Sequence, residues 1–473
     1  MSETTGAAGA ARWISTTEKE AWREKDVPAL QAMASVPGLF LDTANPQQTV
    51  EGFGASFSEL GWDALSVLEE DEREYILKDL FGPGAGANLT LCRMPLGAND
   101  FSRDWYSYDE VADDFDLEHF SIGNDLDTLV PFIRAAKRHQ PALDLWASPW
   151  SPPTWMKVNK HYAGSRAYPE FGQEDNGLRE DQVGRAGTDM IKLDDAVLAT
   201  YAAYFGRFID EYRELGIDIG MVMPQNEFNS AQIFPSCTWT PTGLIAFLRQ
   251  LAPVMAERGV EVFLGTAESP NERLILDVLS DESVRGDIAG VGVQWHGKTG
   301  LPYVHKAEPD LRIYQTEQEC GDGKNDWRYA RHAWNLMRHY FTHGATAYQY
   351  WNIALTEGGL SRWGWAQNSL VVVDPVTRTF RHTHEYQVLK HVSHFVEQGA
   401  RVIPTDSYTG FENQLAFQNP DGSVVLVIQN DLASDQHVDI LIGGQLLPLD
   451  LPADSLNTLV LPAEHFTPVA ASS

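Results

Sequence analysis

Apolar runs of strand length recur between residues 52 and 355, and segments with helical spacing separate them. The runs are rich in Val, Leu, Ile, Met and aromatic residues without strict polar alternation, which is typical of strands buried on both faces. Segment 195–215 has apolar residues at helical spacing before Gly216, and segment 240–258 begins Thr-Pro-Thr, so both are predicted helices. The predicted strands are 52–58, 88–96, 143–148, 220–225, 260–266, 288–295, 311–316 and 345–351.

Eight strand–helix units over roughly 300 residues are typical of an α/β fold of the (β/α)8, or TIM-barrel, kind. We therefore predict a catalytic barrel over residues 52–385. A doubly wound open sheet is the alternative, but no Gly-rich dinucleotide loop follows the first predicted strand.

The pattern changes after about residue 386. Short strands are predicted at 415–418, 424–429, 438–442 and 458–461, with turn signals between them such as Asn419-Pro420-Asp421-Gly422. Residues 386–466 are thus expected to form a small antiparallel β domain. Strand-like pieces at 12–16 and 38–42 lie within residues 11–51, and we expect this N-terminal segment to join the same domain.

Composition and charge narrow the function classes. Lys and Arg number 35 against 66 Asp and Glu, so the formal net charge is −31, which disfavours nucleic acid and anionic membranes as partners. No apolar run approaches the ~20 residues that span a bilayer, and no secretory signal pattern opens the chain, so we expect a cytoplasmic protein. The three cysteines show no disulfide or zinc spacing, and we predict neither a cofactor nor a metal.

Two carboxylates follow predicted strands. Asn226-Glu227 follows the fourth strand, and Glu317 follows the seventh. In a barrel the active site forms at the carboxyl ends of the strands, and a pair of carboxyl groups is the minimum equipment for glycoside hydrolysis. Taken alone, each Glu is more often an ordinary surface charge.

Other strand ends carry side chains that suit a sugar. Aromatic rings match the apolar faces of a sugar, and Asp, Asn, Gln and His match its hydroxyl groups. A single Trp is more often part of the core, but several lie at or near predicted strand ends. The candidate substrate-binding residues are Asp100, Trp150, Asn226, Gln294, His296 and Trp351, with Arg93 in a supporting role.

The segment between Met156 and Lys192 is long, polar and rich in Gly. Connections of this length without regular structure are uncommon and are often lids or binding loops, although a tolerated surface insertion is equally compatible. If it walls off a pocket, exo action is favoured.

The ordered set of motifs resembles glycoside hydrolase family 30, which includes lysosomal glucosylceramidase. The resemblance spans most of the chain. Two departures stand out: Phe228 follows Asn226-Glu227 where many members have Pro, and strand six carries Gln294-Trp295-His296 where glucosylceramidase has His-Trp-Tyr. The matching pieces are Gly52–Ser58, Arg93-Met94-Pro95, Asp100-Phe101-Ser102, the Ala-Ser-Pro-Trp-x-x-Pro-x-Trp motif at 147–155, Asn226-Glu227, Thr316-Glu317, Trp351–Leu355 and Glu357-Gly358-Gly359.

The resemblance implies a (β/α)8 barrel with a β-sandwich side domain built from both chain ends. It also implies a retaining mechanism with Glu227 as acid/base and Glu317 as nucleophile. We expect a nearby Arg93 to favour the charged form of Glu317. Glu319 is a rival to Glu317 only if the strand continues through it, and Glu357 is more often structural.

The preferred substrates are expected to be β-glucosides. Alternatives within the family are β-1,6-glucanase, β-xylosidase and β-fucosidase activity, and a non-catalytic carbohydrate-binding barrel is disfavoured because both carboxylates are present. The sequence carries no indication of oligomeric state.

Overall fold

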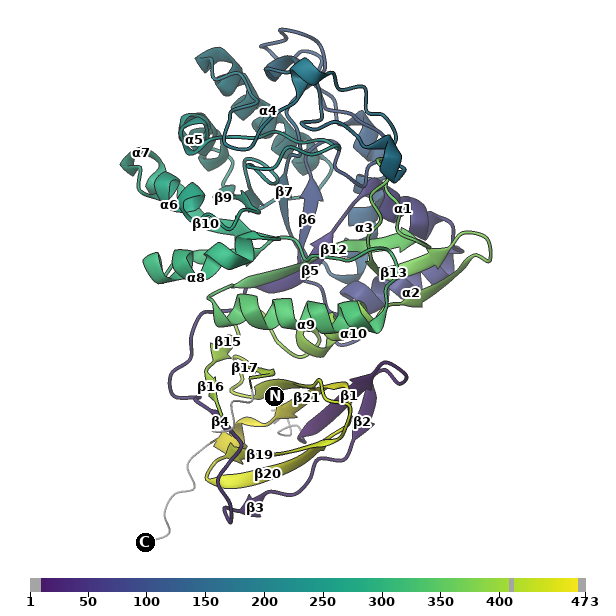
Figure 1. Cartoon of the computed structure of the whole chain (residues 1–473), viewed down its shortest axis with the longest axis vertical. Coiled ribbons are helices and arrows are strands. Elements are labelled where there is room, and N and C mark those ends of the chain that lie inside the picture. The colour runs from purple at the N-terminus through teal and green to yellow at the C-terminus, as the bar shows by residue number, and fades with distance from the viewer. Residues whose placement is uncertain (1–9, 408–411, 467–473) are drawn as a thin grey trace, which may run out of the picture. The chain divides into compact units, whose positions relative to one another are not determined.

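Eight strands form a closed ring in the computed structural model, which describes residues 10–407 and 412–466 (Figure 1). Neighbours in the ring follow chain order from β5 to β12, and β12 pairs with both β5 and β11, which closes the barrel. Each predicted strand overlaps one of these, so the (β/α)8 fold is confirmed. The strands are β5 (Gly52–Ser56), β6 (Leu91–Pro95), β7 (Asp144–Ser148), β8 (Met221–Val222), β9 (Glu261–Ala267), β10 (Ile288–Val293), β11 (Arg312–Gln315) and β12 (Ala347–Thr356).

Amphipathic helices alternate with the strands and cover the outside of the ring, as α4, α5, α6 and α8 do in Figure 1. Their ends follow local sequence signals. In α5 the Thr240 hydroxyl accepts a hydrogen bond from the Gly243 amide at 3.0 Å, and Pro241 occupies the first turn. The helices of this part of the chain are α1 (Glu59–Ser66), α2 (Glu70–Phe81), α3 (Leu129–His139), α4 (Asp195–Glu214), α5 (Pro241–Ala256), α6 (Arg273–Leu279), α7 (Glu282–Arg285) and α8 (Gly297–Ala307).

The inside of the ring is a packed core, because side chains from several strands meet there. A hairpin, β13 (Ser369–Asp374) and β14 (Thr379–His382), extends the sheet beyond β12. The core therefore leaves room for a site only near the ends of the strands. Its cluster consists of Leu91, Trp146, Met221, Met223, Phe263, Tyr314 and Ala347.

Both chain ends contribute to the β-sandwich. Strand β1 (Arg12–Thr17) pairs antiparallel with β21 (Ser455–Leu461), and β4 (Leu39–Leu41) pairs with β19 (Gln436–Ile442), so the expected joining of the N-terminal segment is confirmed. One sheet has the order β15-β17-β18-β21-β1-β2 and the other β16-β4-β19-β20-β3. The remaining strands are β2 (Arg23–Lys25), β3 (Gln31–Ala32), β15 (Arg401–Ile403), β16 (Thr405–Asp406), β17 (Gln414–Gln418), β18 (Val424–Asn430) and β20 (Gln445–Leu451).

Strand β20 is absent from the sequence prediction. It contains Pro448 and follows the Gly443-Gly444 turn, and both signals disfavour a strand. Pairing along its whole length with β19 and burial of leucines such as Leu449 outweigh them.

Contacts divide the chain into two compact units. One comprises residues 53–325 and 343–383, and the other contains the described residues of 1–52, 326–342 and 384–473. Helices α9 (Trp327–Thr342) and α10 (His384–Ser393) fall in the second unit, where the Trp327 indole donates to Asp454 at 2.9 Å. The predicted boundaries placed α9 in the barrel because it follows β11 as a barrel helix would.

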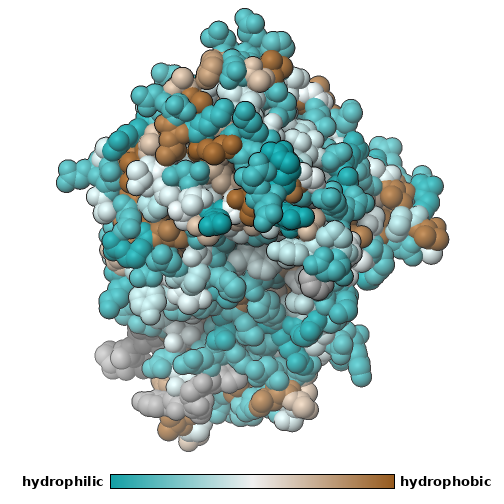
Figure 2. All heavy atoms as spheres, turned by 45° about the horizontal axis from the view of Figure 1, so that its top comes forward, coloured by the Kyte–Doolittle hydropathy of each residue, from teal (hydrophilic) through white to brown (hydrophobic). Residues whose placement is uncertain are grey.

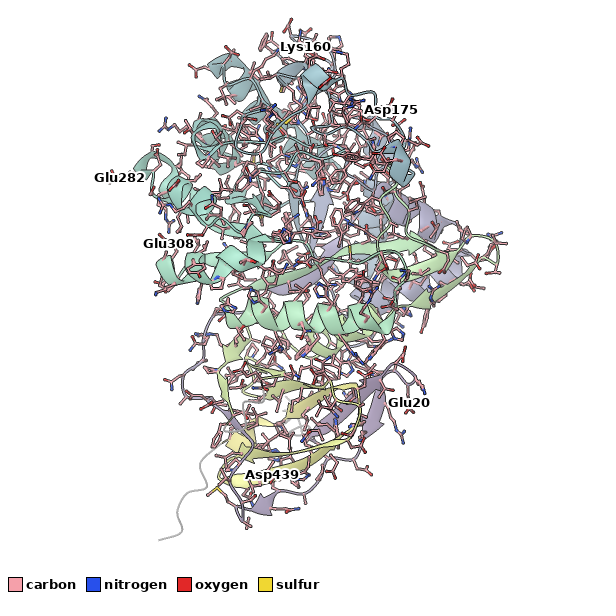
Figure 3. All side chains as sticks on the ribbon, in the orientation of Figure 1. Glu20, Lys160, Asp175, Glu282, Glu308 and Asp439 are labelled. Carbon is pink, nitrogen blue, oxygen red and sulfur yellow. The ribbon has the colours of Figure 1, made fainter. Side chains whose placement is uncertain are left out.

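Exposed acidic side chains lie on separate parts of the surface. Figure 3 labels Glu20, Asp175 and Glu282, which are exposed, on three different segments of the chain. The face shown in Figure 2 is mostly hydrophilic, and hydrophobic residues form only small groups on it. Among the described residues, no helix is both long and apolar enough to cross a membrane.

A buried lysine holds the start of the long segment after Met156. Burial lowers the pKa of Lys157 to about 8. Its ammonium nevertheless donates to the Tyr162 carbonyl at 2.9 Å, the Ser236 carbonyl at 2.6 Å and the Ser151 hydroxyl at 3.1 Å. Three acceptors match the three donors of a lysine, so the side chain ties this segment to the one after Glu227.

We expect Lys157→Met to loosen this segment, because the Ser236 and Tyr162 carbonyls lose the hydrogen bonds from the ammonium, although the Tyr162 carbonyl keeps the one from the Ser236 amide at 3.0 Å. A loss of about 2 kcal/mol in local opening free energy corresponds to roughly 30-fold faster proteolytic cleavage within residues 158–190. Lys160→Met, at an exposed position three residues on, is the matched control. Equal cleavage rates in the two variants would contradict an anchoring role for Lys157.

Candidate active site

Arg93 on β6 organises the carboxyl ends of the barrel strands. Its side chain is completely buried, and its guanidinium lies 4.3 Å from the centre of the Trp150 ring. One terminal nitrogen, Nη1, donates to Glu317 Oε2 at 2.7 Å, and the other, Nη2, donates to Asn226 Oδ1 at 2.7 Å and Ser148 Oγ at 2.9 Å. Charge-assisted bonds of this length are strong and directional, so Arg93 fixes both Glu317 and the residue before Glu227.

The two candidate carboxyl groups share one hydrogen-bond donor. Gln294 Nε2 lies 3.5 Å from Glu227 Oε1 and 3.2 Å from Glu317 Oε2, so these oxygens are separated by no more than the sum of the two distances. That limit is compatible with the ~5–5.5 Å separation of the carboxyl groups in retaining glycosidases. The Thr316 hydroxyl donates to Gln294 Oε1 at 2.8 Å, which directs the amide nitrogen to the carboxyl groups.

The backbone turns sharply where these side chains enter the site. Glu227 has φ +47° and Trp295 has φ +46°, a region that non-glycine residues rarely adopt. The Thr266 hydroxyl accepts a hydrogen bond from the Glu227 amide at 2.9 Å, and the Trp295 indole donates to Glu317 Oε1 at 2.8 Å. Strained residues of this kind persist where surrounding contacts fix them, often at functional sites.

The two carboxyl groups differ in their affinity for a proton. Burial, and after it the negative charge of Glu317, holds the pKa of Glu227 well above its usual range. The hydrogen bond from Gln294 acts in the opposite direction and lowers this pKa. Burial also raises the pKa of Glu317, but Arg93, Trp295 and Gln294 all act against it. The expected contact with Arg93 is therefore present, although it does not bring the pKa of Glu317 below the ordinary value. Of the pair, Glu317 has far more support for its charged form.

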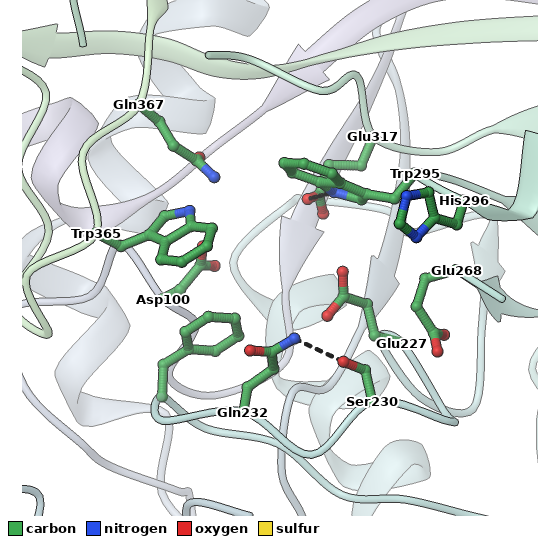
Figure 4. A pocket seen from close by; sticks show the side chains of 11 residues that line it. Asp100, Glu227, Ser230, Gln232, Glu268, Trp295, His296, Glu317, Trp365 and Gln367 are labelled. Atoms are coloured by element: carbon green, nitrogen blue, oxygen red, sulfur yellow. Dashed lines mark hydrogen bonds between the residues drawn. The ribbon is translucent and has the colours of Figure 1, made fainter. Parts of the chain in front are cut away.

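A pocket opens beside the two carboxyl groups (Figure 4). Asp100 faces into it with 4% of its surface exposed, and Asp100 Oδ1 has no hydrogen-bond partner among the described residues. Burial and the charge of Glu317 raise the pKa of Asp100 well above its usual range. The lining residues are Asp100, Glu227, Ser230, Gln232, Phe234, Glu268, Trp295, His296, Glu317, Trp365 and Gln367.

Most of the other predicted sugar-binding residues are buried and are not among the side chains that line this pocket. Trp150 and Trp351 are each 1% exposed and stack against one another with ring centres 5.5 Å apart. The Trp351 indole nitrogen has no hydrogen-bond partner among the described residues. Asn226 and Gln294 are buried as well, whereas His296 lines the pocket itself. Contact of these side chains with a sugar stays a prediction, and for Trp351 the geometry favours donation from the indole N–H.

Several lining residues were not predicted as site residues. Glu268 directly follows β9, so the strand-end rule that selected Glu227 and Glu317 could have found it. Trp365 and Gln367 come from the connection between β12 and β13, which no periodicity in the sequence brings to the site. Trp295 follows the sixth predicted strand, but the sequence carries no signal for its hydrogen bond to Glu317.

Glu319 and Glu357, the other carboxylates near predicted strand ends, do not line the pocket. Strand β11 ends at Gln315, and Glu319 forms an ion pair with Lys298, so Glu317 alone of the two lines the pocket. Glu357 is exposed and accepts hydrogen bonds from Arg381. Its structural role is thus favoured.

Among the side chains that the structure describes, none from the long segment 157–192 lines the pocket. This segment contacts the neighbouring segment that does: the Gly164 amide donates to the Gln232 carbonyl at 2.9 Å, and Asn176 Nδ2 donates to the Ile233 carbonyl at 2.9 Å. The segment therefore supports the pocket wall from behind. From the sequence, this segment could itself have formed a wall of the pocket. The sequence shows that the segment is long and polar, but it does not show which neighbouring segment it contacts.

The chain has the domain organisation of a known hydrolase family. Residues 50–396 match the glycosyl hydrolase family 30 TIM-barrel domain, and residues 399–459 match the glycosyl hydrolase family 30 beta sandwich domain. The chain belongs to glycoside hydrolase family 30. Within this family it is 27% identical to the lysosomal acid glucosylceramidase of Mus musculus, over 87% of the chain and 81% of the relative.

Two further comparisons concern a relative and a solved structure. The endo-1,6-beta-D-glucanase neg1 of Aspergillus fumigatus is 26% identical, over 88% of this chain and 86% of that one. The crystal structure of SrfJ from Salmonella typhimurium has the same fold, with a TM-score of 0.84 and 24% identity over 96% of this chain and 99% of that one. The protein is a glycosidase, as the resemblance implied. In the described parts of this family 30 chain, no three His, Cys, Asp or Glu side chains cluster as a metal site would require.

Proposed function

We propose that the protein is a retaining β-glycosidase acting on β-glucosides, with Glu317 as nucleophile and Glu227 as acid/base. One observation carries this proposal. Two buried carboxyl groups share Gln294, but only Glu317 also receives hydrogen bonds from Arg93 and Trp295. Unequal environments of this kind separate an ionised carboxylate from a protonated one.

In the first step, a Glu317 oxygen attacks the anomeric carbon while Glu227 donates its proton to the glycosidic oxygen. The bond between these two substrate atoms breaks, the leaving group departs as an alcohol, and an ester joins the sugar to Glu317. Arg93 and Trp295 hold the Glu317 carboxylate in place before attack. Proton donation of this kind typically accelerates the step by ~10²–10⁴-fold.

In the second step, Glu227 acts as a base. Because Glu317 is now an ester, the negative charge that raised the pKa of Glu227 has gone. The deprotonated Glu227 takes a proton from water, the water oxygen attacks the anomeric carbon, and the ester bond to Glu317 breaks. Two inversions at that carbon give a product with the configuration of the substrate.

Recognition of a glucosyl group is proposed to depend on Asp100 and Trp351. Asp100 Oδ1 and the Trp351 indole nitrogen are buried without partners among the described residues, and sugar hydroxyl groups would supply them. The glucosylceramidase relative and the 1,6-glucanase relative both carry glucose in their names, which supports a glucosyl group over xylosyl or fucosyl groups.

This proposal predicts a selective loss in Asp100→Ala. The specificity constant on 4-nitrophenyl β-glucoside should fall by roughly 10²-fold or more, but much less on the xyloside, which lacks the hydroxymethyl group. Steady-state kinetics on both substrates, with a melting curve, measures this. Equal losses on both substrates with a lowered melting temperature would instead assign Asp100 a structural role.

The function itself is tested with a panel of nitrophenyl glycosides, with the anomer of the first product followed by NMR. A β-glucoside should be the best substrate, and the β-anomer should form first. Initial release of the α-anomer would contradict retention, and preference for a xyloside or fucoside would contradict the glucosyl assignment.

A further inference from the structure

Glu268 is a pocket carboxyl group that the proposed mechanism does not use. It follows β9, lines the pocket, and its Oε2 atom is buried with no hydrogen-bond partner among the described residues. A buried carboxyl oxygen without a partner costs free energy. A ligand with hydroxyl groups would remove that cost.

The position of Glu268 indicates which part of a substrate it faces. In Figure 4, Asp100 lies on one side of Glu227, and Glu268 and His296 lie on the other. Under the proposed mechanism Glu227 stands beside the glycosidic oxygen, with the glucosyl group toward Asp100 and Glu317. The side of Glu227 that carries Glu268 therefore faces the leaving group.

The wall near Glu227 is polar. Ser230 and Gln232 come from the segment just after Glu227, and Gln232 Nε2 donates to Ser230 Oγ at 2.6 Å (Figure 4). Together with the Glu268 carboxyl and the His296 imidazole, this wall offers both donors and acceptors. A hydrocarbon leaving group would leave the Glu268 Oε2 atom without a partner, whereas a hydroxyl group of a sugar would satisfy it.

We propose that Ser230, Glu268 and His296 bind a sugar as the leaving group, and that Glu268 selects it over a hydrocarbon alcohol. This inference rests on the proposed function and adds the substrate class: a β-glucoside of another sugar, rather than of a lipid. Burial raises the pKa of Glu268 to about 7, so near neutral pH the carboxyl group can both accept and donate hydrogen bonds to hydroxyl groups. Trp365, which is 36% exposed, and Phe234 add an aromatic edge to the same pocket.

The first test compares leaving groups in the wild-type enzyme. The substrates are a β-linked glucose disaccharide and octyl β-glucoside, whose aliphatic alcohol leaving groups both need protonation. The specificity constant should be at least tenfold higher for the disaccharide. A preference for the octyl glucoside would overturn the inference, and this measurement does not depend on the folding of any variant.

The second test uses Glu268→Gln, with Glu261→Gln as the matched control. Glu261 opens the same strand β9, is exposed and pairs with Arg312. In Glu268→Gln the disaccharide-to-octyl ratio of specificity constants should fall at least tenfold, because an NH2 group, which only donates, replaces one of the two acceptor oxygens of the carboxylate. In Glu261→Gln the ratio should stay as in the wild type. An unchanged ratio in Glu268→Gln would overturn the inference.

The third test examines the reverse of leaving-group departure. With 4-nitrophenyl β-glucoside as donor and added glucose as acceptor, an acceptor hydroxyl attacks the anomeric carbon of the glycosyl-enzyme. Its proton passes to Glu227, and the ester bond to Glu317 breaks. Wild type should form disaccharide, and Glu268→Gln should shift the products at least tenfold toward hydrolysis. Equal partitioning in both would overturn the inference, whereas a wild type that cleaves no β-glucoside would overturn the proposed function and this inference with it.

Discussion

Glu317→Gln is expected to reduce turnover of an aryl β-glucoside by on the order of 10⁴-fold or more. The amide keeps the shape of the side chain but removes the attacking charge, and loss of a covalent nucleophile elsewhere has costs of this size. The Arg93 guanidinium and the Trp295 indole would then face an amide in place of the carboxylate that both now contact. Steady-state kinetics and a melting curve, which should show a folded protein, measure the effect.

Glu319→Gln is the matched control, because Glu319 lies two residues further on and pairs with Lys298. It should retain most of the activity. In the smaller variant Glu317→Gly, added azide should restore turnover by taking the place of the nucleophile, and the product should be the α-glucosyl azide. Wild-type-like turnover in Glu317→Gln, or a collapse confined to Glu319→Gln, would transfer the nucleophile role to Glu319.

Glu227→Ala is expected to impair substrates according to the basicity of their leaving groups. Alkyl and sugar leaving groups need the proton and should lose ~10²–10⁴-fold in specificity constant, whereas dinitrophenolate departs without one and should lose little. The specificity constant is the quantity to compare, because it reports only the steps up to formation of the glycosyl-enzyme. The turnover number would also reflect hydrolysis of that intermediate, which is slower without the base. Equal losses across leaving groups would contradict the acid role.

The pH dependence follows from the same assignment. Glu227 must be protonated, so the specificity constant should fall as pH rises through its pKa, which lies well above the usual carboxyl range. Glu317 must be ionised, so activity should fall as pH drops through the lower of the two apparent pKa values of the pair. In Glu227→Gln, with a dinitrophenyl glucoside, the alkaline limb should disappear and the acidic limb should remain. An alkaline limb that survives this change would assign it to another group.

Much of the site was accessible from strand ends alone. Glu227, Glu317, Arg93 and Asp100 were found because the carboxyl ends of parallel strands meet at one edge of a barrel. The sequence could not show that Gln294 contacts both carboxyl groups, because this requires the Thr316 hydroxyl to orient the amide across two strands. Nor could it show that Trp150 and Trp351 pack under Arg93 instead of lining the open pocket.

By itself the sequence determined the eight barrel strands, helices between them and a β domain after about residue 386, while its resemblance to the family implied the joining of both chain ends and the roles of Glu227 and Glu317. Burial on both faces, helical spacing and turn residues are local properties, and they remain readable along a chain. Only the tertiary structure decided the end of β11 before Glu317, the pairing of Glu319 with Lys298, and the place of Glu268 beside Glu227. These features depend on contacts between segments that are distant in sequence. The proton affinities of the carboxyl groups depend on burial, which the local sequence pattern does not contain.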